Sequence, residues 1–535
     1  MRSRIIMSML TALALAVSLL LGAGPVSAAT PSAAVVPPSE FGTDWHDPLT
    51  AAPPVSRPDS RSCEVTLAEA QFRDFTPYRG AYTPPSACGD RWSKVVLRLD
   101  GKVGGRQFDR LGYLHVGGVE IFRTSTPEPS PDGVQWSVEK DVTRYSETFR
   151  QNRDVEMLIG NVVDDTYTGV IDVKVTLTFY TGGSARTPDR VLTLKDGTLT
   201  TPPNSERLVA EVYATGSGGG CEEYWYLTVP DSAPYSCKAA GGHYREVQIT
   251  VDGRLAGIAA PFPTVWTGGW SNPFLWYVIP GPRAFDIKPI TYDLTPFAGI
   301  LDDGRPHRIE VSVAGVPAGQ TGWSTPVNVL VWQDAKSARV TGKLTAHQAG
   351  EPAGSPVYTP GTEHRLDTEG GHRLTVAGYV DTSHGRVTTT VSRTVANTSV
   401  HRWTDGENRD SLDAIWTDDQ AVTVDGPGPA RVTRTDRAYT MEGTTTLGAN
   451  GRLRTVLTLG DRAAVVETRD GRRGAWSRLD DTYTGDATYT ADVPRDQRHA
   501  VGTTSERYRL YGSQGCYDRR LTTVQGMLTE DRDGC

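Results

Sequence analysis

The sequence predicts an all-β protein whose many short strands form sandwiches or jelly rolls. Apolar and polar residues alternate from Ile171 to Phe179, and this period of two marks a strand with one buried face. Asp252-Gly253 directly follows a second alternating segment, Val247–Val251, and this dipeptide favours a tight hairpin turn. Beyond residue 29 no stretch has a convincing long helical period. Short antiparallel strands separated by turn residues are typical of these architectures.

The N-terminus has the parts of a secretory signal, which we place at residues 1–29. Two early Arg residues supply positive charge, Ile5 to Leu21 is almost wholly apolar, and Val26-Ser27-Ala28 fits a small-residue cleavage site. An uncleaved membrane anchor is the alternative, because the apolar segment approaches the length of a short span. The small residues favour cleavage, so we expect a secreted protein without membrane attachment. Residues 30–60, rich in Pro, Ala and Ser, are typical of a tether.

Chain length and strand patterns suggest the domain organisation. At about 150 residues a domain, the chain holds about three domains. The third shows alternating segments of polar and small apolar residues, such as Arg386 to Val395. We expect an N-terminal β-domain at 61–183, a Gly/Pro/Thr-rich connector at 184–205, a second β-domain at 206–335 and a C-terminal β-rich region at 336–535, whose role the sequence does not indicate.

The cysteines agree with export. Six Cys fall in three close pairs along the sequence, which are Cys63/Cys88, Cys221/Cys237 and Cys516/Cys535. Sequence alone leaves other pairings open, but three local disulfides in an oxidising compartment are the simplest expectation. A zinc site is the alternative, and the pairs lack the Cys-x-x-Cys spacing typical of one.

Charge and histidine usage narrow the partners. The chain has a net charge of −8, only nine of its 55 basic residues are Lys, and no basic run stands out. This argues against nucleic acid as a partner. The ten His are scattered without metal-like spacing, so we expect no metal or other cofactor. We expect the mature protein to be a monomer.

Adjacent carboxylates within an aromatic segment give the first candidate site. Glu222 and Glu223 follow Cys221 and precede Tyr224, Trp225 and Tyr226. A carboxyl group that is desolvated among rings can act as an acid or base near neutral pH. The alternative is a solvated loop after the glycine-rich residues 216–220, which is the common outcome for a pair of Glu.

Three further segments are candidates. Phe108-Asp109-Arg110 precedes a strand, where Arg110 could keep the Asp109 carboxylate ionised; the alternative is a turn. Asn161 and Asp164 lie in a segment whose polar groups could bind hydroxyls or merely build turns. The segment from Trp266 to Trp276 is either a packed aromatic core or an exposed platform on which sugar rings stack, and its Gly and Pro breaks favour the platform.

With these motifs the chain resembles the peptide-N-glycosidase A family. The resemblance covers about residues 60–335, and residues 336–535 match less clearly. It rests on two long segments in the right order, with Leu158-Ile-Gly-Asn-Val-Val in the first and Cys221-Glu-Glu-Tyr-Trp-Tyr226, Trp266-Thr-Gly-Gly-Trp270 and Asn272-Pro-Phe-Leu-Trp276 in the second.

The resemblance implies both a reaction and a fold. Members of this family cut the amide between the innermost GlcNAc and Asn of an N-linked glycan, without a metal, and turn Asn into Asp. The related F type has two eight-stranded jelly rolls side by side, so the resemblance implies two adjacent jelly rolls here, acting on N-glycosylated peptides or proteins.

The resemblance also implies roles for individual residues. Asp109 matches the catalytic Asp of the F type and would activate water or orient the amide, while Glu223 matches its essential Glu and would bind the linkage. Arg110 would hold Asp109, and Asn161 or Asp164 would replace a second Glu of that type. Glu222 and the three Trp residues are the remaining candidate substrate contacts, the Trp residues by stacking on GlcNAc: Trp225, Trp270 and Trp276.

Two other functions remain open at this point. Jelly rolls host many lectin-like modules, so a carbohydrate-binding protein without catalysis is one alternative. An endo-acting glycoside hydrolase that uses Asp109 and Glu223 as its carboxylate pair is the other.

Overall fold

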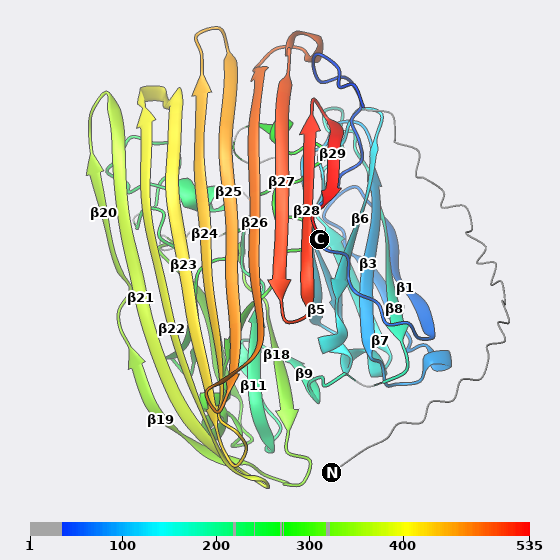
Figure 1. Ribbon diagram of the computed structural model, residues 1–535, viewed down its shortest axis with the longest axis vertical. Helices are drawn as coiled ribbons and strands as arrows, with labels where there is room; N and C mark the ends of the chain where they lie inside the picture. Colours follow the sequence, from blue (N-terminus) through cyan, green and yellow to red (C-terminus); the bar gives the residue numbers. More distant parts are fainter. Residues whose placement is uncertain are drawn as a thin grey trace, which may run out of the picture. The chain divides into compact units, whose positions relative to one another are not determined.

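The computed structural model describes residues 35–183, 185–217, 221–239, 241–267, 270, 272–316 and 322–535. Val36–Cys535 forms one compact unit (Figure 1). The expected signal segment, residues 1–29, lies outside the described residues. Across the described ranges, no helix has the length and apolar character needed to traverse a membrane.

The first eight strands form a jelly roll. One sheet has the order β1-β8-β3-β6 and the other β2-β7-β4-β5, so the chain crosses repeatedly between two antiparallel sheets, as in a jelly roll. Short helices η1 (Ser86–Cys88), η2 (Thr143–Tyr145) and η3 (Thr148–Arg150) lie in its connections. The strands are β1 (Ser62–Phe72), β2 (Tyr78–Tyr82), β3 (Lys94–Val103), β4 (Leu111–Val116), β5 (Val119–Ser125), β6 (Val134–Asp141), β7 (Arg153–Ile159) and β8 (Ile171–Tyr180).

A second jelly roll comes next in the chain, with the same strand order. Its sheets have the orders β9-β18-β11-β15 and β10-β16-β13-β14, which repeat the first roll when the eight strands are counted along the chain. The short strands β12 (Thr215–Gly216) and β17 (Trp323–Ser324) pair with each other. The eight strands are β9 (Arg190–Thr193), β10 (Thr198–Leu199), β11 (Ser205–Val212), β13 (Glu246–Val251), β14 (Arg254–Ala259), β15 (Ile290–Asp293), β16 (His307–Ala314) and β18 (Val327–Gln333).

The expected connector at 184–205 is therefore not a linker. It contains β9 and β10, which pair with β18 and β16 of the second roll. Gly, Pro and Thr residues suggested a loop, but backbone pairing overrides local composition in short edge strands. The helices of the second roll are η4 (Cys221–Leu227), η5 (Pro273–Leu275), η6 (Thr295–Phe297) and α1 (Ala298–Leu301).

The C-terminal region is one antiparallel sheet of eleven strands. Its long strands lie side by side in chain order, and β20 pairs beside β19 on β21 (Figure 1). The short helices η7 (Asp405–Glu407) and η8 (Arg495–Gln497) lie in its turns. The strands are β19 (Thr341–Ala349), β20 (Ala353–Thr359), β21 (Glu363–Thr382), β22 (Gly385–Thr404), β23 (Arg409–Asp425), β24 (Arg431–Leu447), β25 (Arg452–Arg469), β26 (Arg472–Thr490), β27 (Val501–Gly512), β28 (Gly515–Val524) and β29 (Met527–Asp533).

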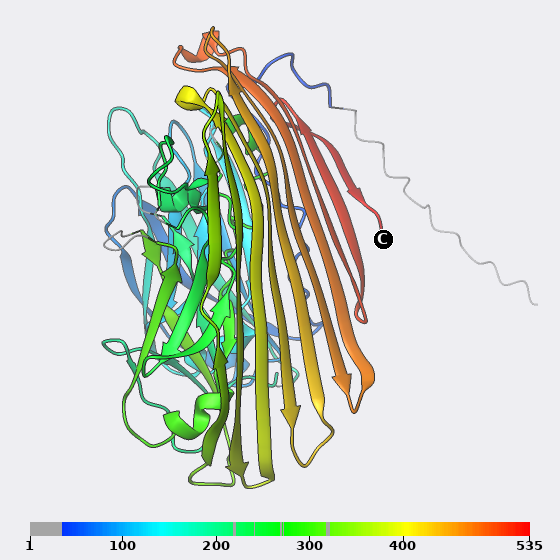
Figure 2. The same ribbon diagram turned by 90° about the vertical axis from the view of Figure 1, so that its left-hand side faces the viewer.

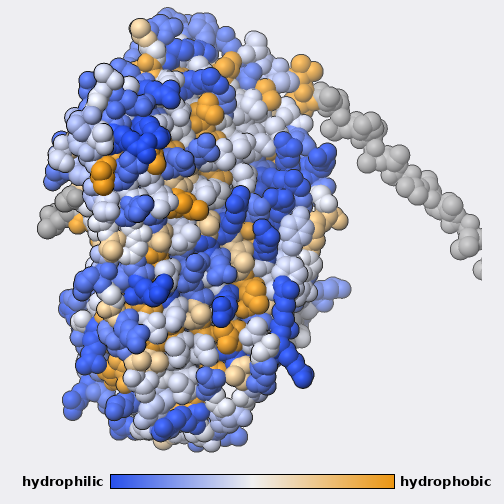
Figure 3. Space-filling model, turned by 60° about the vertical axis from the view of Figure 1, so that its left-hand side comes forward, coloured by the Kyte–Doolittle hydropathy of each residue, from blue (hydrophilic) through white to orange (hydrophobic). Residues whose placement is uncertain are grey.

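The large sheet packs one face against the jelly rolls and leaves the other to solvent (Figure 2). In β23, buried residues such as Trp416 alternate with exposed ones such as Ile415, as the pleat of a strand requires. Trp416 contacts Trp225 of η4 with ring centroids 5.1 Å apart. The side of the molecule drawn in Figure 3 is mostly hydrophilic, with small separate hydrophobic areas. The predicted all-β class is thus confirmed, and the C-terminal region forms a supporting layer.

Residues 41–51 are not a tether but a docked arm, which corrects the expectation for 30–60. Trp45 is buried, and the arm makes backbone hydrogen bonds from Phe41 to Ala500, from His46 to Gly526 and from Leu49 to Val278. These partners belong to the large sheet and to the second roll. The aromatic residues Phe41 and Trp45 were the available signal for a packed segment, because solvated tethers contain few aromatic residues.

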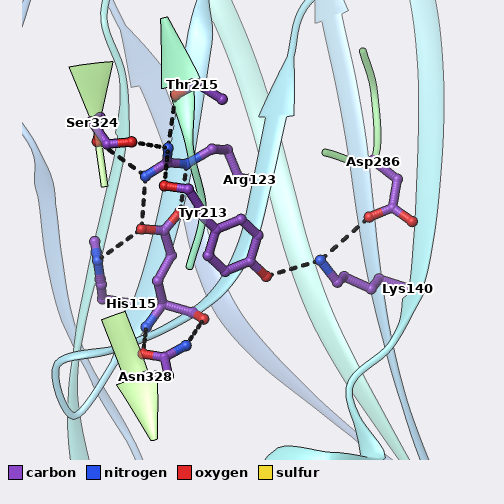
Figure 4. Close-up of polar contacts among 9 residues, drawn as sticks. His115, Arg123, Lys140, Tyr213, Thr215, Asp286, Ser324 and Asn328 are labelled. Carbon is purple, nitrogen blue, oxygen red and sulfur yellow. Dashed lines mark hydrogen bonds and ion pairs between the residues drawn. The ribbon is translucent and has the colours of Figure 1, made fainter. Parts of the chain in front are cut away.

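A buried polar network joins the two jelly rolls (Figure 4). Arg123 of β5 pairs with Glu120 at 2.7 Å and donates a hydrogen bond to Thr215 of the second roll, also at 2.7 Å. Asn328 of β18 bonds to the backbone of Glu120, and Lys140 of β6 reaches the Tyr213 hydroxyl. Buried ionic groups cost free energy unless every donor and acceptor is satisfied, so these contacts restrict how the rolls pack.

The three expected disulfides are confirmed: Cys63–Cys88, Cys221–Cys237 and Cys516–Cys535. The first links β1 to η1, the second holds the start of η4, and the third ties the last residue to β28.

Candidate active site

Three carboxyl groups from both jelly rolls come together: Asp109, Glu128 and Glu223. Asp109 follows β3, Glu128 follows β5, and Glu223 lies in η4 of the second roll. The charge of Asp109 raises the pKa of both Glu128 and Glu223, so Asp109 lies within electrostatic reach of both glutamates. The structure therefore places the two catalytic candidates together and adds a third.

The loop that carries Asp109 is held by its neighbours. Gln107 is buried, and its side-chain amide donates hydrogen bonds to the carbonyl oxygens of Val162 and Gly169 in the β7–β8 connection. The Arg110 backbone N–H donates to the Thr126 hydroxyl at 2.9 Å. Asp109 itself stays partly exposed. A positioned and accessible carboxylate is what general base catalysis requires.

Glu128 lies in a rigid, buried connection. It stands between Pro127 and Pro129, and residues 119–130 are all buried. Each proline fixes its own φ and keeps the preceding residue extended, so the backbone on both sides of Glu128 is restricted. The Tyr277 hydroxyl interacts with the Glu128 carboxyl group and favours its ionised form.

Glu223 is positioned by η4, which is anchored by three buried side chains. Glu222, Trp225 and Tyr226 are buried, while Glu223 and Tyr224 are partly exposed. The disulfide from Cys221 fixes the start of the helix, and the kink at Tyr224 breaks its helical geometry. Adjacent glutamates thus face opposite environments.

Burial sets the ionisation of the glutamates. Desolvation, with the nearby charge of Asp109 as a second cause, raises the pKa of Glu223 to about 7. The same two causes raise the pKa of Glu128 well above its usual value, while the Tyr277 hydrogen bond and the Arg110 charge lower it. Neighbouring carboxylates resist simultaneous ionisation, so the site can hold an acid and a base at one pH.

Arg110 lies beside this cluster. Its guanidinium donates to the Gln107 side chain and lies 5.9 Å from the centre of the Tyr167 ring. Its positive charge reaches Glu128. Arg110 therefore supplies a cation next to the carboxyl groups, as a site that stabilises developing negative charge would need.

The three Trp residues expected to stack on sugars are instead buried in the core. Trp225 packs against Trp416, Trp270 stacks on Tyr226, and Trp276 stacks on Tyr483. All three are at most 5% exposed. The Gly and Pro breaks suggested an exposed platform, but the large sheet covers this segment. The packed aromatic core is the correct interpretation.

Glu222 is also unavailable to a substrate, because its carboxylate is bound by other side chains. Its carboxylate accepts hydrogen bonds from Arg245 at 2.7 and 2.9 Å and from the Trp323 indole at 2.6 Å. Both Glu222 and Arg245 are at most 1% exposed. A fully buried and paired carboxylate cannot reach a substrate, so Glu222 is not among the proposed substrate contacts.

Asn161 and Asp164 build the β7–β8 connection. Asn161 is buried and donates to the carbonyl oxygens of Phe72 and Gly169. Asp164 accepts hydrogen bonds from the backbone of Thr166 and Tyr167, which lower its pKa. Both side chains therefore stabilise the turn, which was the alternative interpretation.

Rings that remain accessible near Asp109 come from other positions. Phe108 is 46% exposed and lies 5.3 Å from Tyr167. Tyr167 and Tyr224 are partly exposed. These rings border the carboxyl cluster from three different connections, where a flat ring can stack on a pyranose face.

Glu128 was not among the residues that the sequence singled out. The available signal was an acidic residue between two prolines just after a strand, because the prolines restrict the backbone and functional carboxyl groups need fixed positions. The proximity of Glu128 to Asp109 could not be predicted from the sequence, because 18 residues lie between them and these residues include the strand pair β4 and β5.

One group of side chains in the described ranges has the spacing of a cation site: Glu206, Asp334 and His384. Asp334 already accepts hydrogen bonds from Ser383 and from the Lys336 backbone N–H. These bonds hold the turns that follow β18 and β21.

Two jelly rolls of equal topology, each contributing carboxyl groups to one site, define the class of protein. The chain belongs to the peptide N-acetyl-β-D-glucosaminyl asparaginase amidase A family, whose model matches residues 52–201 and 195–350, more than half of the chain. A relative from Prunus dulcis, peptide-N4-(N-acetyl-β-glucosaminyl)asparagine amidase A, is 30% identical over 381 residues. That match covers 63% of this chain and 66% of the relative, just under two thirds of its length.

Likeness to solved structures is loose. PNGF-II matches with a TM-score of 0.36 at 14% identity, over 51% of this chain and 66% of that chain. The PBSX exported protein XepA matches with a TM-score of 0.14 at 10% identity, over 50% of this chain and 86% of that chain. Values this low carry no argument about the site.

Proposed function

We propose that this protein is a secreted amidase that hydrolyses the bond between the innermost GlcNAc and Asn of N-linked glycans. The observation that carries the proposal is the cluster of Asp109, Glu128 and Glu223, which joins residues of both rolls. Family membership supports the reaction class, and the three disulfides are compatible with an exported protein. N-glycosylated peptides or proteins are the proposed substrates.

The proposed chemistry divides two proton transfers between two carboxyl groups. Asp109 accepts a proton from water, whose oxygen attacks the side-chain carbonyl carbon of the glycosylated Asn. The carbon–nitrogen bond then breaks, and Glu223 in its acid form gives a proton to the leaving nitrogen. The peptide keeps an Asp, and the sugar leaves as a glycosylamine, which water converts to the free sugar and ammonia.

Arg110 and Glu128 adjust the charge around these steps. Arg110 stabilises the negative charge that develops on the attacked amide. The raised pKa of Glu128 favours its protonated form, which avoids a third negative charge beside Asp109. Phe108, Tyr167 and Tyr224 are the proposed ring contacts for GlcNAc.

The direct test is Asp109→Asn, which removes the base and keeps the shape of the side chain. We expect this variant to fold normally and to release glycan from a glycopeptide at least about 10²-fold more slowly, in the range that general base catalysis supplies. Asp165→Asn is a matched control, because Asp165 is an exposed Asp in the neighbouring connection. Near-normal turnover by the Asp109 variant would refute the assignment.

The product distinguishes the alternatives. Mass spectrometry of the treated glycopeptide should find Asp in place of Asn. A GlcNAc stub left on Asn would identify an endo-acting glycoside hydrolase. Glycan binding without release on prolonged incubation would identify a lectin-like protein.

A further inference from the structure

The docked arm reaches the carboxyl cluster through one side chain, Tyr277. Trp45 stacks on the Tyr277 ring with centroids 4.0 Å apart and an interplanar angle of 5°. Phe41 meets the same ring edge-on at 5.8 Å. Tyr277 is buried, and its hydroxyl interacts with the Glu128 carboxyl group. The arm therefore packs on the side chain whose hydroxyl interacts with Glu128.

The backbone beside Tyr277 is strained, and the arm holds it. Val278 has a φ of 78°, in the left-handed region that a β-branched residue rarely adopts. Its carbonyl oxygen accepts a hydrogen bond from the Leu49 N–H at 2.7 Å. Such a conformation persists only where its surroundings fix it, and it is typical of functional segments.

The large sheet clamps the arm from the other side. Arg495 lies 5.5 Å from the centre of the Trp45 ring, and its guanidinium donates to the Gly42 carbonyl at 2.7 Å. The Ala51 N–H donates to Glu506 of β27 at 3.0 Å. Trp45 is thus fixed between the η8 turn and Tyr277, and its ring has little freedom to move.

We infer that residues 41–51 are a positioning element for the reaction, in which Trp45 and Leu49 hold Tyr277 so that its hydroxyl orients Glu128. The inference rests on the proposed function, since Glu128 belongs to the proposed active site. It assigns the arm and the large sheet a part in catalysis through Tyr277, without contact between the arm and the substrate.

The first test compares Trp45→Leu with Trp92→Leu. Trp92 is equally buried and packs on Phe179 before β3, at the end of the roll away from Asp109. We expect Trp45→Leu to lower kcat by about 10- to 100-fold with little change in KM, because misplaced groups lose rate rather than binding. Trp92→Leu should lose stability alone. Trp45→Phe, which keeps a ring over Tyr277, should recover most of the activity.

The second test separates positioning from general loosening. Tyr277→Phe removes only the hydroxyl and should reproduce the kcat loss of Trp45→Leu, and the double variant should lose little more than either single one. Fully multiplied losses in the double variant would overturn the inference. So would a folded Trp45→Leu variant with wild-type kcat.

The third readout does not depend on catalysis. Infrared titration of the Glu128 carboxyl group, identified by its loss in Glu128→Gln, should give a higher pKa in both variants than in the wild type. Tyr277→Phe removes the hydroxyl that lowers the Glu128 pKa, and Trp45→Leu lets that hydroxyl move away from the carboxyl group. The charged or titratable groups that interact with Glu128 or lie within reach of its charge are Asp109, Arg110, Tyr224, Tyr277, Tyr489 and Arg498.

An unchanged Glu128 pKa in Trp45→Leu would overturn the inference. If the wild type itself releases no glycan, the proposed function fails, and the infrared titration still decides whether the arm controls Glu128.

Discussion

Glu222 and Glu223 are neighbours in the chain with opposite roles. Glu222 points into the protein and pairs with Arg245, while Glu223 is partly exposed beside the charge of Asp109. The difference comes from solvation and partners, because a carboxyl group without a cation gains a higher pKa on burial and a paired one is held as a structural ion. The resemblance to a known motif singled out Glu223, and the structure supplies this physical reason.

A pH profile tests the role of Glu223. Burial raises the pKa of Glu223 to about 7, so the side chain keeps its proton below that pH and loses it above. Because the acid form serves the leaving nitrogen, we expect kcat/KM to fall as pH rises through about 7. Rates on a glycopeptide measured across neutral pH check this. The Glu223→Gln variant should be much slower and should not show the fall near pH 7. A profile that rises through pH 7 would mean that the ionised form works.

Among the elements, η4 shows how a short helix is made rigid. A helix of this length has little stability of its own. A disulfide at Cys221, the buried pair of Glu222 and Arg245, and the packing of Trp225 on Trp416 fix it from three directions. These three contacts, made with other parts of the chain, fix the position of Glu223.

Breaking the buried pair should loosen η4. We expect Arg245→Met to cost about 3–5 kcal/mol in the free energy of unfolding, because it leaves the Glu222 carboxylate buried and unpaired. Adding Glu222→Gln should restore part of that loss. Urea unfolding measures both, and Arg308→Met, which breaks an exposed pair with Glu310, should cost less than about 1 kcal/mol. Equal losses for Arg245→Met and Arg308→Met would contradict this account.

At the scale of the molecule, the large sheet supports the site from behind. Its inner face covers the aromatic segment of residues 272–277, with Tyr483 donating to the Leu275 carbonyl oxygen and Asn272 donating to the Ala487 carbonyl oxygen. A sheet of this area buries apolar surface that the two rolls would otherwise expose. The role that the sequence left open for 336–535 is therefore structural support, with the η8 turn extending it toward Trp45.

Removal of the sheet should unfold or aggregate the rolls. A chain ending at Gln333 would expose Trp225, Trp270 and Trp276, so we expect little soluble protein and no glycan release, measured by expression and activity assay. Trp416→Arg should behave similarly, whereas Ile415→Arg, its exposed neighbour in β23, should be tolerated. A soluble, active chain of residues 36–333 would show that the sheet is dispensable.

The sequence by itself determined the all-β class and the family, and it predicted the three local disulfides, because alternation, motif order and cysteine spacing are local or pairwise patterns. It also singled out Asp109 and Glu223. Only the tertiary structure decided that β9 and β10 belong to the second roll, that the tryptophans are covered, and that Glu128 joins the site. These depend on which surfaces are buried against each other, and burial is set by contacts between residues hundreds of positions apart, such as Trp225 with Trp416.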